Sequence, residues 1–310
     1  MSAATGKLTL PSSDRTPTWE DQFTRPPQSY LSAAWAKLRR DRIAMIALIG
    51  LTLIAAVSFS SVWISATILH QDPNEVNLDE IFAPPSRQHW LGTDELGRDE
   101  LSRLLSAGRV SLSIGVAVAI VSMTLGVMIG LTSGFFGGMI DDASNAVIQT
   151  LMNIPMTFLL ILLALLFHPG PIGLAVIIGI TSWMGTARLV RGKVFSLRER
   201  DYIDAARMVG AGNWRLMMRH ILPNVLSLIV VIAAFDVAAG IMVESGLSFL
   251  GMGVQPPTAS WGNMLINSRE YALNAWWLVA APGVMIFLTI LFIFLLANGL
   301  RDALDPWVKQ

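Results

Sequence analysis

The chain contains no cysteine, which excludes disulfide bonds and thiolate metal sites. It also contains few charged residues, 14% of its 310 residues, whereas an average soluble domain has about 25%. The 22 basic and 22 acidic side chains cancel, so there is no basic excess of the kind that indicates a nucleic-acid partner. With 53% hydrophobic residues, the composition indicates an integral membrane protein rather than a soluble domain.

Residue patterns that support catalysis or cofactor binding are also missing. No two of the four histidines have metal-ligand spacing, and no nucleophile is paired with a base, which argues against an intramembrane enzyme. A phosphate-binding loop of the Walker type is absent, because Gly192-Lys193 is followed by Val194 and lacks a glycine at the required distance before it. We therefore expect a non-enzymatic chain that holds no cofactor or metal and does not bind ATP by itself.

Long uncharged runs predict an all-α membrane protein with about six transmembrane helices. A bilayer core about 30 Å thick takes roughly 20 apolar residues in a helix. The run 143–187 is too long for one crossing, and His168-Pro169-Gly170-Pro171 divides it in two. The predicted spans are residues 43–69, 110–140, 143–167, 172–187, 226–250 and 276–298.

Basic residues predict the orientation, since cytoplasmic loops of membrane proteins are enriched in Lys and Arg. One group precedes the first span, and a larger one lies between the fourth and fifth spans: Arg188, Arg191, Lys193, Arg198, Arg200, Arg207, Arg215 and Arg219. Both groups are expected in the cytoplasm, together with both termini. The resulting organisation is a cytoplasmic tail 1–42, a first helix 43–69, an external loop 70–109, a core 110–300 with five helices, an external loop 252–275 within it, a cytoplasmic loop 188–223 and a cytoplasmic tail 301–310.

Small residues recur every fourth position in the second predicted span. They are Ser122, Gly126, Gly130, Gly134 and Gly138. Such a strip occupies one face of a helix and lets another backbone approach closely. Helix packing is the favoured interpretation, and a role in gating is the alternative.

Two carboxylates interrupt the fifth predicted span, Asp236 and Glu244. A charge at the middle of the bilayer costs roughly 2.5–3.5 kcal/mol on insertion scales, so neither side chain is expected to face lipid. They are candidates for the lining of a translocation path or for hydrogen bonds between helices. A proton relay is the alternative, and Glu244 can also lie close to the outer surface.

The segment 198–224 is too polar to cross the membrane and too regular for a plain linker. Asp201 is in position to cap a short helix, Gly210 and Gly212 interrupt it, and Pro223 marks the entry into the fifth span. This pattern predicts a helix–turn–helix elbow on the cytoplasmic side. The residues alone leave two interpretations equally open, a basic loop that faces lipid headgroups and a docking element for a soluble partner.

This elbow resembles the EAA loop of ABC importer permeases. The match consists of Asp204-Ala205-Ala206, Gly210 and Leu222-Pro223, with His220 two residues before Leu222. The family usually has Glu where Asp204 stands and Ile where His220 stands. The resemblance implies that these seven residues contact an ATPase subunit, and the shorter side chain of Asp204 changes the reach of that contact.

Two further stretches are similar to the C-type subunit of the dipeptide/oligopeptide/nickel permease family. They are HWLGTDELGRDELSRLLSAGRVSLSIG, residues 89–115, and VESGLSFLGMGVQPPTASWGNML, residues 243–265. The leading segment SYLSAAWAKLRRDRIAMIALI also looks like that subunit. The resemblance extends from about residue 29 to residue 307.

The resemblance implies the type I importer permease fold and a multi-pass location in a prokaryotic inner membrane. It implies four partner chains besides lipid: a homologous B-type permease, two ATPase subunits, identical or different, that hold ATP and Mg, and an external substrate-binding protein. The solute stays open among dipeptides, oligopeptides, glutathione, opines, nickel chelates and oligosaccharides. The alternative function is a proton-coupled secondary transporter that uses Asp236 or Glu244, although such folds usually contain internal repeats and the two halves of this chain show none.

Overall fold

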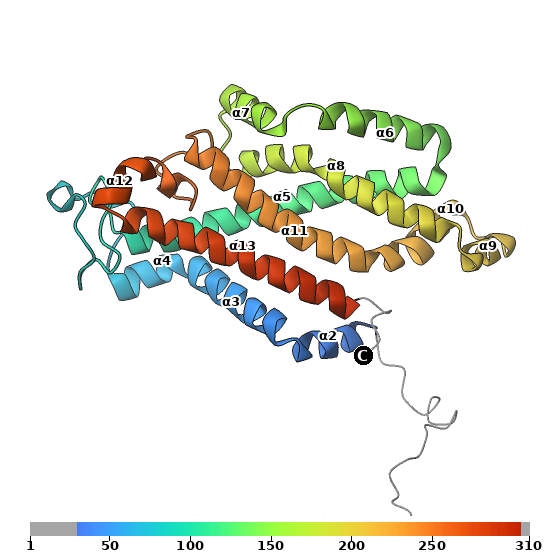
Figure 1. The fold of residues 1–310 in the computed structure, drawn as a ribbon, viewed down its shortest axis with the longest axis horizontal. Helices are drawn as coiled ribbons and strands as arrows, with labels where there is room; N and C mark the ends of the chain where they lie inside the picture. The colour runs from blue at the N-terminus through green and yellow to red at the C-terminus, as the bar shows by residue number, and fades with distance from the viewer. Residues whose placement is uncertain (1–29, 305–310) are drawn as a thin grey trace, which may run out of the picture.

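The computed structural model describes residues 30–304, and these form an all-helical bundle without a β-strand. The long helices run side by side along the longest axis of the molecule, and shorter elements gather at its two ends (Figure 1). Residues 1–29 and 305–310, which belong to the two predicted tails, lie outside the described residues. Residues 30–40 of the first tail form a helix.

The α-helices, labelled as in Figure 1, are α2 (Tyr30–Arg40), α3 (Arg42–Phe59), α4 (Ser61–Ile64), α5 (Glu100–Phe136), α6 (Gly138–Met152), α7 (Met156–Phe167), α8 (Pro171–Arg198), α9 (Asp201–Met208), α10 (Asn213–Arg215), α11 (Leu222–Phe249), α12 (Ser268–Asn274) and α13 (Trp277–Leu304). Two π-helical segments, Ser65–Leu69 and Leu216–Ile221, and two 3₁₀ turns, Leu78–Glu80 and Asn263–Leu265, complete the structure.

Five helices are long and apolar enough to cross a membrane: α3, α5, α8, the continuous stretch Asn213–Phe249 that contains α11, and α13. The third predicted span, 143–167, is not a straight helix. It corresponds to α6 and α7, which meet at an angle of 80°. The break precedes Pro155, which has no backbone N–H for a helix interior. The count of six therefore holds only when this bent pair is one span.

The helices extend beyond the predicted apolar runs. Helix α5 begins ten residues before residue 110, where the Asp99 carboxylate accepts a hydrogen bond of 2.7 Å from the backbone N–H of Ser102. Helix α8 continues to Arg198, so the first third of the predicted loop 188–223 is helical. Charged residues are stable in a helix once it leaves the apolar layer, and hydropathy therefore underestimates helix length.

The small-residue strip lies between α5 and α8. A Cβ atom placed on Gly130 would be 2.5 Å from the carbonyl oxygen of Ala187, and one on Gly134 would be 2.9 Å from that of Arg191. Gly126 likewise faces Thr186. The two backbones approach so closely that side chains do not fit between them. The assignment of Gly138 to this strip is wrong, because α5 ends at Phe136 and a Cβ on Gly138 would meet nothing within 4 Å.

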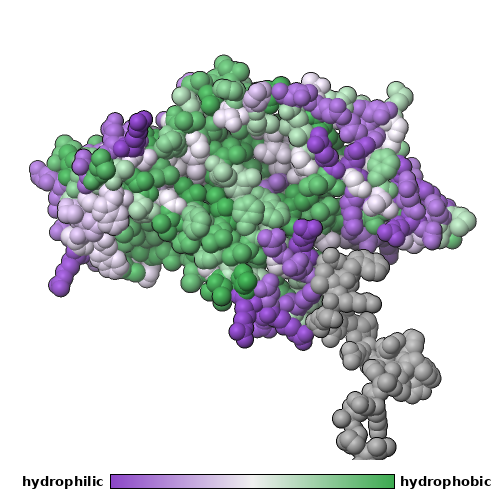
Figure 2. Space-filling view, in the orientation of Figure 1, coloured by the Kyte–Doolittle hydropathy of each residue, from purple (hydrophilic) through white to green (hydrophobic). Residues whose placement is uncertain are grey.

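Hydropathy separates the surface into a band and two ends. Hydrophobic residues cover the middle of the bundle, whereas hydrophilic residues gather around α9 and α10 at one end, near α2, and at the loops of the opposite end (Figure 2). Among the exposed large apolar side chains in the band are Ile46, Phe158 and Phe287. This distribution is that of a protein whose middle faces lipid.

Candidate functional site: the elbow between α8 and α11

The elbow, defined here as residues 200–223, projects from one end of the bundle (Figure 1). It consists of α9, a turn, α10 and the π-helical segment Leu216–Ile221, which continues into α11. All seven residues that the EAA resemblance selects lie in it. The predicted helix–turn–helix shape is present. Its second helix begins at α10 and continues through the π-helical segment into α11 without a break.

Helix α9 begins and ends through different local interactions. Asp201 is its first helical residue, and Arg200 occupies the N-cap without a side-chain hydrogen bond, so the predicted cap at Asp201 is wrong. Asp201 and Asp204 instead lie in the first turn, where negative charge is favourable to the helix dipole. At the other end Gly210 has φ = +84°, and its N–H donates to the carbonyl of Arg207 at 2.9 Å. Glycine adopts this left-handed conformation without a Cβ penalty.

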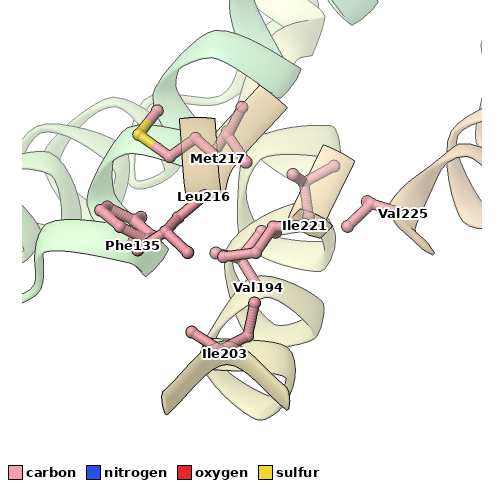
Figure 3. Packing of buried hydrophobic residues seen from close by; sticks show 9 residues of the cluster. Phe135, Val194, Ile203, Leu216, Met217, Ile221 and Val225 are labelled. Atoms are coloured by element: carbon pink, nitrogen blue, oxygen red, sulfur yellow. The ribbon is translucent and has the colours of Figure 1, made fainter. Parts of the chain in front are cut away.

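One side of α9 is anchored in the bundle. Ile203 is fully buried, and Figure 3 shows it pointing toward Val194 of α8 and Ile221 of the π-helical segment. The same cluster includes Phe135 at the end of α5 and Val225 of α11. Three membrane helices therefore meet at the foot of α9. A displacement of α9 cannot leave them unchanged, because a close-packed core transmits strain.

The other side of the elbow is exposed and partly apolar. Met208, Val209 and Trp214 are 83%, 86% and 70% exposed. Asp204 is exposed beside them and forms an ion pair of 3.0 Å with Arg207 one turn later. Large apolar side chains at this exposure, grouped on a short projecting element, are typical of an interaction surface.

The second half of the matched motif lies where the elbow joins α11. Leu222 and Pro223 occupy the first turn of α11, directly after the π-helical segment. Proline suits this position, because its missing N–H is not needed in the first turn of a helix. His220 is partly buried, and its backbone carbonyl accepts a hydrogen bond of 2.6 Å from the side-chain amide of Asn224.

The carboxylate of Asp236 connects three membrane helices. It accepts hydrogen bonds from the hydroxyls of Ser122 on α5, at 2.8 Å, and Thr186 on α8, at 3.2 Å. Ser122 begins the small-residue strip, so the polar contact lies at one end of the close approach between α5 and α8. The geometry is that of an interhelical hydrogen bond.

Glu244 is fully buried near the other end of α11. Its carboxylate accepts hydrogen bonds from Ser248, at 2.7 Å, and from Ser111 of α5, at 3.2 Å. Ser111 also accepts the backbone N–H of Trp261 at 3.1 Å, so the network fixes the loop after α11 to the bundle. Glu244 thus lies inside protein, close to the end of α11 that is opposite the elbow.

Two arginines of α8, predicted only as part of the cytoplasmic positive charge, connect α8 to α6 and to α5. Arg191 of α8 forms a bidentate pair with Asp141 of α6, with one contact of 2.6 Å. Arg198 donates to the carbonyl oxygen of Phe135 at 3.1 Å. No sequence pattern reveals the first pair, because its partners are 50 residues apart on different helices.

Comparison with known proteins identifies the family. Residues 126–310 match the model of the binding-protein-dependent transport system inner membrane component, and residues 29–85 match the N-terminal transmembrane domain of oligopeptide transport permease C. This chain belongs to the ABC importer permeases. It is therefore a membrane-embedded transport component of an importer and not an enzyme.

Named relatives of this permease cover almost its whole length. The dipeptide transport system permease protein DppC of Bacillus subtilis (strain 168) is 37% identical over 292 residues, 94% of this chain and 90% of the relative. The di/tripeptide transport system permease protein DppC of Pseudomonas aeruginosa (strain UCBPP-PA14) is 36% identical, over 91% and 94% of the two chains. A putative peptide permease protein of Brucella suis biovar 1 (strain 1330) is 38% identical, over 86% and 88%. The permease is thus similar to C-type subunits along its length.

Proposed function

We propose that this permease forms half of the translocation path of an ATP-driven peptide importer and that its elbow couples it to an ATPase subunit. The observation that carries the coupling role is the two-sided elbow. Ile203 is buried at the meeting point of three membrane helices, while Met208, Val209 and Trp214 are exposed on the other side. The names of the relatives support a peptide as the solute.

The elbow acts as a short lever. When two ATPase subunits bind ATP and Mg and close, a cleft that holds Met208 and Val209 carries α9 with it. The foot at Ile203 transmits that displacement to α8, and through Phe135 to α5. Such rigid-body coupling needs a stiff element and a packed foot, and no catalytic group. The side chains of Asp204 and Arg207 contribute polar contacts at the rim of the interface.

The family supports the remaining parts of the proposed assembly. A homologous B-type permease completes the path, and an external substrate-binding protein delivers the solute. The elbow lies in the cytoplasm with both termini, which the basic residues around it favour. The opposite end of the bundle then faces outward, and the apolar band of Figure 2 lies in a prokaryotic inner membrane.

The proton-coupled alternative has little support in the geometry. Asp236 and Glu244 are each satisfied by hydroxyl groups of the same chain, and the family is that of importers with separate binding proteins. Both carboxylates serve as interhelical hydrogen-bond acceptors.

The deciding experiment compares exposed residues at the two ends of the molecule. Val209→Asp places a charge on the elbow, where the native side chain is 86% exposed, and Leu273→Asp places one on α12 at the opposite end, where it is 91% exposed. Neither change disturbs a buried contact, so membrane levels should match the wild type. The V209D variant should lose co-purification of the ATPase subunits and substrate-stimulated ATP hydrolysis, whereas L273D should keep both.

Two further variants test the shape and charge of the elbow. Gly210→Pro is incompatible with φ = +84°, and Asp204→Lys reverses an exposed charge. Each should reduce assembly with the ATPases without lowering the membrane level. Full assembly and full ATPase stimulation in V209D, G210P and D204K together would show that the elbow is not the coupling site.

A further inference from the structure

The end of the molecule opposite the elbow contains a group of charged side chains that the transport mechanism does not use. It is formed by the turns between residues 82 and 99 and the first turn of α5. The carboxylate of Asp94 is at its centre, bonded to Nε of Arg98 at 2.7 Å and 3.3 Å from Nε of Arg103. Although Asp94, Arg98 and Arg103 carry charge, all three are at least 90% buried. The ion pairs give this end a fixed shape.

A pocket of about 130 Å³ opens beside this group. Its walls come from the turns around Asp94, from the start of α5, and from residues 256–278. Glu95, Glu100, Arg98 and Tyr271 are among the side chains that line it. Distant parts of the chain thus line one open pocket with both polar and apolar walls.

Glu100 is the unusual member of the pocket wall. It is 2% exposed, and its Oε1 atom has no hydrogen-bond partner among the described residues. The backbone N–H of Glu100, by contrast, donates a hydrogen bond to the carbonyl of Gly92 at 3.0 Å. A buried carboxylate oxygen without a partner is costly. Glu100 is therefore the carboxylate of this group that is left for a donor from outside the chain.

The charges around the pocket show the sign of that donor. Arg98 is bonded to Asp94 and Glu95, and Arg103 is bonded to Asp94 and to the carbonyl oxygen of Pro73. Three carboxylates therefore share this wall with two guanidinium groups that are already bonded, and Glu100 is the carboxylate that has no ion pair among the described residues. Among the described residues no cluster has the composition and geometry of a metal site. A positively charged organic group with N–H donors fits this pocket best.

We propose that this pocket binds the primary ammonium group of a small solute and that Glu100 is the carboxylate that receives it. The volume suits a single ammonium group with the few atoms next to it. This assignment rests on the proposed function of a peptide importer. The source of the ammonium group is therefore the amino terminus of a peptide. A solute arriving from outside would then meet Glu100 at the outer end of α5, before the membrane helices.

The experiment measures binding to the full-length permease in lipid nanodiscs by saturation-transfer NMR. The probes are dialanine, N-acetyl-dialanine, which lacks the ammonium group, and propylammonium, which lacks the peptide. The variants are Glu100→Gln, which keeps the shape and removes the charge, and Glu75→Gln, which changes an exposed carboxylate in the same loop. Unfolding midpoints establish that each variant is folded, and Glu100→Asp serves as a second, charge-conserving variant.

We expect dialanine and propylammonium to bind the wild type and E75Q equally, and E100Q at least fivefold more weakly. N-acetyl-dialanine should bind the wild type at least fivefold more weakly than dialanine, a comparison that needs no variant. Equal affinity of the acetylated and free peptides, or unchanged binding to E100Q, would overturn the site. If propylammonium bound and dialanine did not, the amino terminus of a peptide would not be the source of the ammonium group. If binding depended on Glu100 only when the external binding protein was present, the pocket would not bind a small solute by itself. Co-purification of ATPases with E100Q should be normal, so this test fails independently of the elbow.

Discussion

Single glycines set the distance between α5 and α8. We expect Gly130→Ala to destabilise the permease by about 1–3 kcal/mol, the usual cost of overpacking. The added methyl group would lie 2.5 Å from the carbonyl oxygen of Ala187, and a backbone atom cannot rotate away. Thermal unfolding of the purified chain in detergent provides the measurement.

The matched control is Gly192→Ala on α8, where a Cβ meets nothing within 4 Å. Alanine has a higher helix propensity than glycine, so this variant should gain up to about 1 kcal/mol. Equal unfolding midpoints for the two variants would show that α5 and α8 are not in close contact at Gly130.

Asp236 distinguishes the importer from a proton-coupled transporter. Asp236→Asn keeps a carbonyl oxygen that can accept from Ser122 and Thr186, now 2.8 and 3.2 Å from the carboxylate. It cannot exchange a proton. We expect ATP-driven uptake within about twofold of wild type between pH 6 and 8, since a satisfied neutral acceptor costs little. Lost uptake with intact ATP hydrolysis would instead favour a proton role, and radiolabelled peptide uptake into proteoliposomes decides between them.

At the scale of elements, the turn after α9 determines where the exposed tip of the elbow points. Gly210→Ala should destabilise that turn by about 1–2 kcal/mol, the penalty of a left-handed conformation for a residue with a Cβ, because φ at Gly210 is +84°. Gly212→Ala is the control, since φ at Gly212 is −69°, which alanine adopts without strain, and a weaker N-cap at this position affects α10 and not α9.

Hydrogen exchange of the α9 amides measures this effect directly. Faster exchange in G210A than in G212A, with unchanged exchange in α5 and α8, is the expected outcome. Slow exchange in both variants would mean that α9 is held by its buried foot at Ile203 and not by the turn.

The whole molecule makes one prediction about its placement in the membrane. Since the chain has no cysteine, Met208→Cys on the elbow and Leu273→Cys on α12 each introduce a single thiol, at sites 83% and 91% exposed. In cells that express the permease without its ATPase subunits, we expect a membrane-impermeant maleimide to label Leu273→Cys in intact spheroplasts and Met208→Cys only after lysis. Labelling of both from the same side would contradict the proposed topology.

Much of this architecture could be predicted from local sequence. The apolar runs predicted four of the five straight spans closely, although their helices extend further into water. The first span was predicted to reach residue 69, yet α3 ends at Phe59 and a short α4 and a π turn follow. The spacing of Gly126, Gly130 and Gly134 marked a packing face, and glycines 210 and 212 marked a turn. These features are local because they depend on hydropathy, helix period and the conformational freedom of glycine.

Other features depended on contacts between distant residues, which no local pattern specifies. The sequence determined that Asp236 and Glu244 avoid lipid, because exposing a carboxylate to the membrane interior costs several kcal/mol. Only the tertiary structure decided which hydroxyls donate to these carboxylates and that Arg191 pairs with Asp141. It also decided that Glu100, whose Oε1 atom has no partner among the described residues, lines a pocket. The chemistry of a side chain decides whether it can face water or lipid. Its partner is decided by the packing of helices that are distant in the chain, as for Ser111 and Glu244, which are 133 residues apart.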